Sequence, residues 1–243
     1  MRYTLALVRT SDNNAIFKDA AVVDIGKVKL SKLSWMMPRV LPNDEMKYKL
    51  YKSIESKSVL DACFRMRQCN VVEIPTNATS MSWRLGVRTA PEKPRYVIVG
   101  IQANKADNQD HNASLFDHSS VTNMSVVLNS TKYPSLDANA NFTTHQFTPF
   151  YKAMTEFTRD YYGLDSIIGG SGINPMAFKE LTPLFVFNVS KKSERLNHGV
   201  VDITVEMQFA ANAVAAHTCA YALVISDRRL KLQSDGKKMH VLY

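Results

Sequence analysis

The segment Met81-Ser82-Trp83-Arg84-Leu85-Gly86-Val87-Arg88 sets apolar residues at every second position, with polar residues or glycine between them. A period of two is typical of a β-strand that has one face in a core and the other toward water or a neighbouring subunit. We therefore expect a half-buried strand here that carries Trp83 into the core.

The next apolar segment, Tyr96-Val97-Ile98-Val99-Gly100-Ile101, is a continuous run rich in β-branched residues. Such a run is expected for a strand that is covered on both faces. The two prolines of Pro91-Glu92-Lys93-Pro94 separate it from the strand before. Further strands are expected at residues 28–35 with a bulge at Lys32, and at residues 59–66, 71–74, 124–128, 184–189, 200–209 and 219–225, with residues 212–216 as a hairpin loop.

Two segments have helical spacing instead. Residues 45–54 follow Asn43 and Asp44, either of which can cap a helix N-terminus, and residues 149–161 repeat large apolar side chains every three or four positions. Residues 104–122 and 163–175 are long polar or glycine-rich loops. About eight strands, uneven loops and two short inserted helices predict an all-β protein, an antiparallel jelly-roll sandwich.

Composition limits the class of protein. The 243 residues are 45% hydrophobic, which is enough for one large all-β domain, and no apolar run is long enough to span a bilayer. No secretory signal is evident, and the three cysteines, Cys63, Cys69 and Cys219, are expected to be reduced thiols. The net charge of +8 favours an acidic partner, but the basic residues are spread along the chain, so a solvated surface is the simpler interpretation.

No motif predicts catalysis. Gly169-Gly170-Ser171-Gly172 lacks the lysine of a phosphate-binding loop, and no nucleophile elbow is present. One loop does collect ionisable residues, but polar loops often do so without binding a metal. The ionisable residues of this loop are Asp107, Asp110, His111, Asp117 and His118. We expect no enzyme activity, no metal and no cofactor.

Large apolar residues near the loops and helices exceed what two sheets need for their own core. Some of them are expected to contact a neighbouring subunit, although each could instead cap an end of the sandwich. The predicted subunit interface consists of Trp35, Met36, Phe150, Tyr151, Met154, Phe157, Tyr161 and Tyr162.

Several short segments of the sequence resemble the double jelly-roll major capsid-like proteins of the Polinton and adintovirus type. These proteins occur in viruses and as endogenous viral elements in animal genomes. The segments are Lys27-Val28-Lys29-Leu30-Ser31-Lys32-Leu33-Ser34-Trp35-Met36-Met37-Pro38, Pro91-Glu92-Lys93-Pro94-Arg95-Tyr96-Val97-Ile98-Val99-Gly100, Phe116-Asp117-His118, Val127-Leu128-Asn129-Ser130 with Tyr133-Pro134, and Thr218-Cys219-Ala220-Tyr221. The resemblance implies that residues 26–243 form the C-terminal roll and that residues 1–25 are the tail of a preceding roll or an N-terminal strand. A complete member has a full N-terminal roll, so a truncated or relict gene product is one interpretation.

The resemblance implies a structural virion-type protein, a capsid subunit that acts through self-assembly. Its partners would be copies of itself in a homotrimer or larger assembly, other capsid subunits, and packaged nucleic acid in non-specific contact, but no membrane. It would be located in the virion capsid, and in the host cytoplasm or nucleus before assembly.

Two other functions stay open from the sequence alone. A non-catalytic β-sandwich binding module could present Tyr133, Phe142 and Tyr162 to a glycan or to nucleic acid. A cupin-like enzyme would need a metal held by histidine and glutamate on the strands, and the predicted strands contain almost no histidine.

Overall fold

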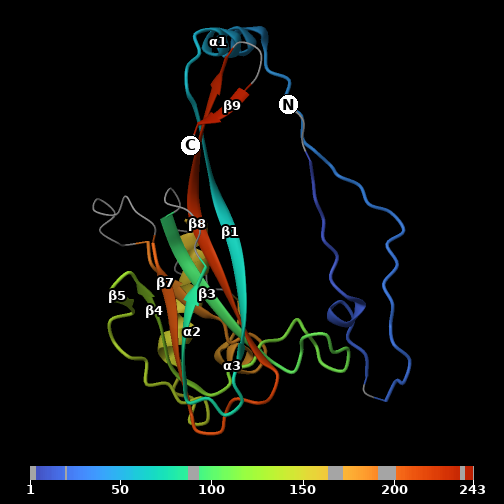
Figure 1. Cartoon of the computed structure of the whole chain (residues 1–243), viewed down its shortest axis with the longest axis vertical. Helices are drawn as coiled ribbons and strands as arrows, with labels where there is room; N and C mark the ends of the chain where they lie inside the picture. The colour runs from blue at the N-terminus through green and yellow to red at the C-terminus, as the bar shows by residue number, and fades with distance from the viewer. Residues whose placement is uncertain are drawn as a thin grey trace.

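Two antiparallel β-sheets face each other in the computed structural model, which describes residues 4–19, 21–86, 93–163, 172–190, 201–235 and 239–242 (Figure 1). The first sheet has the strand order β1-β8-β3-β6, with β9 also paired to β8, and the second has the order β2-β7-β4-β5. The strands are β1 (Leu60–Ile74), β2 (Ser80–Leu85), β3 (Lys93–Ala103), β4 (Val121–Leu128), β5 (Thr131–Tyr133), β6 (Phe185–Asn188), β7 (Ile203–Phe209), β8 (Thr218–Ser234) and β9 (Met239–Leu242).

The pairing is that of a jelly roll. The first eight strands pair as β1 with β8, β2 with β7, β3 with β6 and β4 with β5, all antiparallel. This is the pattern of one long hairpin that is bent back and rolled up, with β3–β8 and β4–β7 pairs closing each sheet. The predicted all-β antiparallel jelly-roll sandwich is confirmed.

The core lies between the two sheets, and alternation along each strand supplies it. In β7 every second residue is buried, and its partner positions on β2 include Trp83, which is buried as predicted. Val97, Val99 and Ile101 of β3 are fully buried. Each such side chain contributes about 1.5–3 kcal/mol relative to exposure to water, so this layer dominates the stability of the roll.

Three α-helices and one 3-10 turn, η1 (Asp12–Asn14), accompany the described strands. α1 (Asp44–Glu55) begins where the Asn43 side chain accepts a hydrogen bond from the Met46 N–H at 2.9 Å, as the sequence predicted. α2 (Thr148–Tyr162) ends at Gly163, whose φ of 63° terminates the helix in the left-handed conformation. α3 (Pro175–Glu180) is a short helix that was not predicted.

Most strand predictions are confirmed, with two extensions. The segments predicted at residues 59–66 and 71–74 form one strand, β1, because the polar residues between them pair continuously with β8. β3 begins at Lys93 and therefore includes Pro94, which a register shift before Tyr96 accommodates. Val87 and Val200, at the ends of two predicted strands, lie outside the described residues.

Two predictions are wrong. Residues 28–35 pair with no described strand and have no regular secondary structure, because a strand needs a neighbouring strand that shares its backbone hydrogen bonds and none of the described strands provides them. Residues 212–216 do not form a hairpin loop, since β7 and β8 belong to different sheets and this connection crosses from one sheet to the other.

One pair of strands extends beyond the sandwich. β1 pairs with β8 from Leu60 to Ile74, whereas β3 pairs with β8 only as far as Asp227. Residues 60–64 and 228–232 therefore continue as a two-stranded ribbon, and β9 pairs with residues 231–234 on the other side of β8. We call this ribbon with β9 the arm; it rises from the sandwich, and α1 lies at its far end (Figure 1).

Candidate assembly surface

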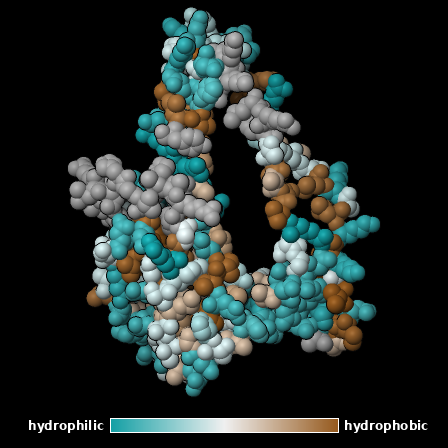
Figure 2. Space-filling model, in the orientation of Figure 1, coloured by the Kyte–Doolittle hydropathy of each residue, from teal (hydrophilic) through white to brown (hydrophobic). Residues whose placement is uncertain are grey.

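Exposed large hydrophobic side chains are concentrated outside the roll. Of the 28 exposed ones among the described residues, 21 lie between Leu5 and Phe64. They occupy residues 4–43, which we call the strap, together with α1 and the start of β1, and Figure 2 shows brown patches along these parts. Large exposed apolar surface of this kind marks sites of protein association.

The shape of the chain explains this exposure. The strap runs beside the roll as an irregular extended segment, with open space between it and the arm (Figures 1 and 2). The accessible surface of the chain is 16654 Å², whereas a compact monomer of 27.4 kDa is expected to expose about 10,900 Å². The excess is of the size that obligate interfaces bury, which can exceed about 2,000 Å² in total.

The strap is attached to the roll by a polar clasp, which we define as Gln109 and its neighbours in the loop between β3 and β4. The Gln109 side chain is 4% exposed; its Oε1 accepts from the Gly26 N–H at 2.9 Å, and its Nε2 donates to the Gly26 carbonyl at 2.9 Å and to Asn13 Oδ1 at 3.1 Å. The backbone of Lys18 donates to the Gln109 carbonyl at 2.9 Å. The clasp fixes one point of the strap and leaves its apolar residues exposed.

The acidic residues of the same loop serve this clasp. Asp107 accepts from the Ser11 hydroxyl at 2.6 Å, and its own N–H donates to Asn14 Oδ1 at 2.7 Å. Asp110 forms an ion pair with Lys18 at 2.7 Å. Among the described residues no group of three or more histidine, cysteine, aspartate or glutamate side chains is arranged to hold a metal ion.

The predicted interface residues fall into three groups. Trp35, Met36 and Tyr162 are exposed, with Met36 exposing 88% of its surface. Tyr151, Phe157 and Tyr161 are half-buried on α2. Phe150 and Met154 are buried inside the roll, so these two are not accessible to another subunit in this structure; the interface prediction as a whole is not tested by a single chain.

The burial of α2 follows from its contacts with the first sheet. The Phe150 ring lies edge-on to Phe185 of β6, with ring centroids 4.8 Å apart, and Phe157 lies edge-on to Tyr96 of β3 at 4.9 Å. At the end of the helix the guanidinium of Arg65 lies 4.3 Å from the centre of the Tyr161 ring. α2 therefore covers the β6 edge and part of the outer face of the sheet.

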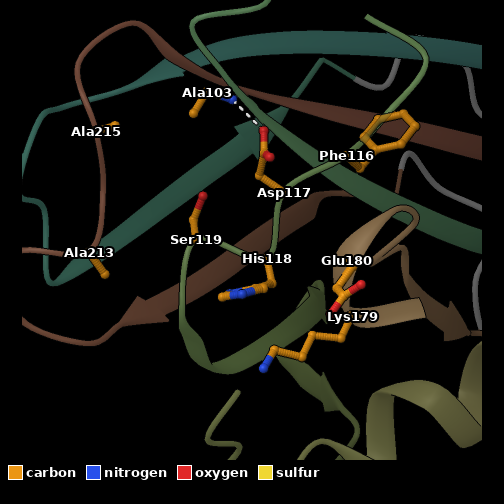
Figure 3. A pocket seen from close by; sticks show the side chains of 9 residues that line it. All are labelled: Ala103, Phe116, Asp117, His118, Ser119, Lys179, Glu180, Ala213 and Ala215. Atoms are coloured by element: carbon orange, nitrogen blue, oxygen red, sulfur yellow. Dashed lines mark hydrogen bonds between the residues drawn. The ribbon is translucent and has the colours of Figure 1, made fainter. Parts of the chain in front are cut away.

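A small pocket lies at the end of the roll opposite the arm (Figure 3). It measures about 350 Å³, and Phe116, His118, Ser119, Lys179 and Glu180 are among its lining residues. Its walls come from three places: the end of β3 with the loop before β4, α3, and the connection between β7 and β8. Small side chains, Ala103, Ala213 and Ala215, leave the space open.

The ionisable groups of the pocket mainly hold the loop. Asp117 accepts from the Ala103 N–H at 2.9 Å and pairs with Lys105 at 2.8 Å, as Figure 3 shows for the first contact. The His118 ring is stacked on Phe142 at 4.4 Å, and its Nδ1 accepts from the Ser120 N–H at 2.9 Å. Burial, and next the charge of Lys179, lower the pKa of His118, so the neutral imidazole is favoured.

The structure also bears on other predictions from the sequence. The Phe142 ring is buried in the core, so it cannot stack on a ligand as the binding-module hypothesis required. Cys63 and Cys69 are exposed, Cys219 is half-buried, and all three are free thiols. Gly169, Gly170 and Ser171 lie outside the described residues. Gln109 was missed because a single glutamine in a polar loop carries no sequence signal.

The helices described in the structure include none with the length and apolar character needed to cross a bilayer. No curated protein matches the sequence. Similar solved structures include PBCV-1 VP54 fitted into a cryo-EM reconstruction of the virophage Sputnik, at 10% identity and a TM-score of 0.46 over 83% of this chain and 54% of that chain. The Sputnik virophage cryo-EM structure matches at 11% identity and a TM-score of 0.39 over 76% of this chain and 39% of that one.

The crystal structure of the mavirus major capsid protein matches at 10% identity and a TM-score of 0.35, over 76% of this chain and 42% of that one. The chain thus spans about half the length, or less, of these structures. The family model of the double jelly roll-like domain matches residues 1–230, nearly the whole chain, and the rolled-up strand pairing agrees with it. The chain belongs to the double jelly roll-like domain family.

Proposed function

We propose that this chain is a structural subunit of a virion shell that works by packing against other subunits. The observation that carries the proposal is the apolar surface of the strap, α1 and the arm, which the described residues of the roll leave uncovered. Water disfavours that surface by about 25 cal/mol for each Å². Covering it with a neighbouring subunit supplies the free energy for assembly. The solved structures that share the fold are of virus capsids and a major capsid protein, which agrees with this role.

We also propose how the chain is divided. Residues 26–243 form the C-terminal roll with its entering segment, and residues 1–25 belong to the end of a preceding roll. The clasp supports this division, because Gly26 is the last strap residue that it holds. A preceding roll held at that point would lie next to the exposed apolar residues of the strap.

The proposal includes the expected partners and location. Copies of this chain form a trimer or a larger assembly with other capsid subunits, and the protein resides in the virion capsid. It performs no catalysis. The pocket at the loop end supports this last point, because Asp117 and His118 there are engaged in holding the loop.

Light scattering coupled to size-exclusion chromatography tests the proposal. At micromolar concentration the purified chain should elute with a mass of three times 27.4 kDa or more, and electron microscopy should show discrete particles. Trp35→Ser should weaken the assembly by at least about tenfold in dissociation constant, because buried tryptophans dominate interfaces. Leu136→Ser is the matched control, since Leu136 is exposed on the side of the roll beside α2 and β6, outside the strap, and should have no effect.

A stable monomer over the whole concentration range would refute assembly as the function. A trimer that both variants leave unchanged would refute the strap as the interface. Equal weakening by Leu136→Ser would move the interface to the side of the roll formed by α2 and β6.

A second candidate is a non-catalytic binding module for a glycan, favoured by the pocket at the loop end. Its imidazole, ammonium and hydroxyl groups, from His118, Lys179 and Ser119, could donate hydrogen bonds to a sugar acid. Titration of glucuronic acid against glucose, followed by the His118 ring signals in NMR, tests it. Unchanged signals with both sugars would remove this candidate.

A further inference from the structure

A groove rich in positive charge lies at the foot of the arm, where the first sheet narrows to two strands. It measures about 510 Å³ and combines three separate parts of the chain, because Phe64 pairs with Arg228 and Lys93 pairs with Asp227 in the strand register. Among the described residues, four cationic side chains and one carboxylate line it. The lining residues are Cys63, Phe64, Arg65, Lys93, Asp227, Arg228 and Arg229.

The carboxylates that the structure describes at this groove, Asp227 and Asp61, are already paired. Asp227 accepts from Arg95 at 2.5 Å, and Asp61 accepts two hydrogen bonds from Arg229, the shorter at 2.6 Å. The hydrogen bond from Arg229 lowers the pKa of Asp61, so this acid stays ionised and paired near neutral pH. Two further cations lie next to the groove on the same strands, Arg67 on β1 and Lys231 on β8, so an anion that enters meets a net positive surface.

One of the cations is held in position before any ligand arrives. Arg65 stacks on the Tyr161 ring at 4.3 Å and donates from Nη1 to the Tyr161 carbonyl at 3.1 Å. Only one of its five N–H donors is used in that bond. A side chain that is already ordered loses little conformational entropy on binding, which favours Arg65 as an anion contact.

The opposite end of the roll lacks this excess of charge. The pocket there is lined by one lysine and by two carboxylates, Asp117 and Glu180. Lysines near that end have partners of opposite charge, Lys105 with Asp117 and Lys18 with Asp110. The positive charge is therefore directed toward the arm end of the roll.

We propose that the groove at the foot of the arm binds the phosphate backbone of nucleic acid. Cations spaced along a ribbon match a polyanion with regularly repeated charges better than a single small anion. Phe64, which lines the groove and is 46% exposed, has an aromatic ring on which an unpaired base can stack, so a single strand binds more tightly than a duplex. The orientation that follows, with the arm end toward packaged nucleic acid, rests on the proposed shell function, whereas the binding itself does not.

Fluorescence anisotropy with a labelled single-stranded oligonucleotide of about 20 nucleotides tests the proposal. Four phosphate contacts predict a slope of about −3 in log affinity against log salt concentration, and hence a loss of about 50-fold between 50 and 200 mM salt. Lys93→Gln combined with Arg228→Gln removes two contacts and should halve the slope to about −1.4. The matched control, Lys179→Gln, removes a positive charge at the opposite end of the roll and should leave the slope unchanged.

Each outcome of these measurements either supports or overturns the proposal. Absence of binding by the wild-type chain at 50 mM salt overturns the proposal, and this measurement does not depend on the folding of any variant. An unchanged slope in the arm variant, with its circular dichroism melt intact, also overturns it, as does an equal change in Lys179→Gln. Binding to vesicles of phosphatidylcholine and phosphatidylserine without binding to the oligonucleotide would assign the groove to a membrane instead.

The same preparations separate this proposal from the shell function. If the chain stays monomeric but binds the oligonucleotide with the expected slope, the proposal for the groove is supported and the shell function is refuted. If the chain assembles but does not bind the oligonucleotide, the shell function is supported and the proposal for the groove is refuted.

Discussion

Replacing Gln109 by alanine should weaken the attachment of the strap at Gly26 without unfolding the roll. The Gln109 side chain is buried and makes three hydrogen bonds to the strap, two with the backbone of Gly26 and one with the side chain of Asn13. No described side chain of the strap belongs to the buried hydrophobic core. The substitution therefore changes the attachment of the strap and leaves the layer between the sheets intact.

The magnitude follows from these bonds. A hydrogen bond contributes about 0.5–1.5 kcal/mol net, so three of them contribute about 3 kcal/mol to closing the clasp. Since 1.4 kcal/mol corresponds to a factor of ten, the opening equilibrium should rise about a hundredfold. Gln109→Glu keeps an acceptor for the Gly26 N–H and loses both donated bonds, so its effect should be intermediate.

Hydrogen exchange of the Gly26 amide measures this opening directly. The amide should exchange about a hundredfold faster in Gln109→Ala, while amides of β3 and β7 keep their rates. Asn108→Ala is the matched control, because Asn108 is the adjacent amide side chain and donates only within its own loop, to the Asn104 carbonyl at 3.2 Å. Trypsin should also cleave after Lys27 faster in the Gln109 variant alone.

An unchanged rate at Gly26 in Gln109→Ala would refute the clasp as the attachment of the strap. A loss of protection throughout β3 and β7 would refute the claim that strap and roll are energetically separate.

Three further predictions concern the roll itself. Phe185→Ala removes a fully buried ring and should lower the free energy of unfolding in urea by about 3–5 kcal/mol; a loss below about 1 kcal/mol would contradict its place in the core. Gly100→Ala would bring a Cβ within 2.5 Å of the Phe116 ring and should lower the free energy of unfolding by about 1–3 kcal/mol. In a double-mutant cycle, Phe116→Ala should relieve most of this loss. Additive losses of stability in the two variants would contradict the contact. Burial and the charge of Lys179 lower the pKa of His118 in the folded chain, so the unfolded state binds the proton more tightly and the stability falls as the pH drops below about 6.5. His118→Gln should reduce this pH dependence in thermal melts from pH 7.5 to 5.5. An identical pH dependence in the variant would exclude His118 as its cause.

The fold could be predicted wherever a strand has one face in the core. The alternation around Trp83 and the apolar run from Tyr96 to Ile101 both report burial, so they located β2 and β3. β5 and α3 span 3 and 6 residues, which is too short for a periodic pattern to stand out from a loop. The length of β8 was also missed, because the arm lies outside the core and its residues have no buried face to enforce an alternating pattern.

The exposure of the predicted interface residues was only partly predictable, and the interface itself stays a prediction. Trp35 and Met36 are exposed as an interface requires, but Phe150 and Met154 show the same helical spacing and are buried, because an apolar stripe looks alike whether it meets the chain's own core or another subunit. The groove was not predictable. Its cations come from three segments that are far apart in the sequence, and only the register of β1, β8 and β3 brings these segments together.

The wrong strand prediction at residues 28–35 and the exposed surface of the strap have one physical cause. The segment has the apolar spacing of a strand, but from residue 23 to residue 42 no backbone-to-backbone hydrogen bond joins it to another described segment. The backbone groups of Gly26 and Val28 are bonded only to side chains. An extended segment satisfies both its backbone groups and its apolar side chains only beside another strand. A covering subunit that merely shielded the side chains would leave these N–H and carbonyl groups without partners in a dry interface, at a cost of about 1–3 kcal/mol each.

The covering surface should therefore contribute a strand edge as well as an apolar face, and residues 28–35 should become a strand on assembly. Hydrogen exchange of these amides in the assembled and monomeric chain measures this change. Strong protection at alternate amides is expected in the assembly, because in an edge strand every second N–H points to the neighbouring strand. Equal exchange in both states would mean that the segment stays outside the interface, and the assembly surface would then reduce to α1 and the arm.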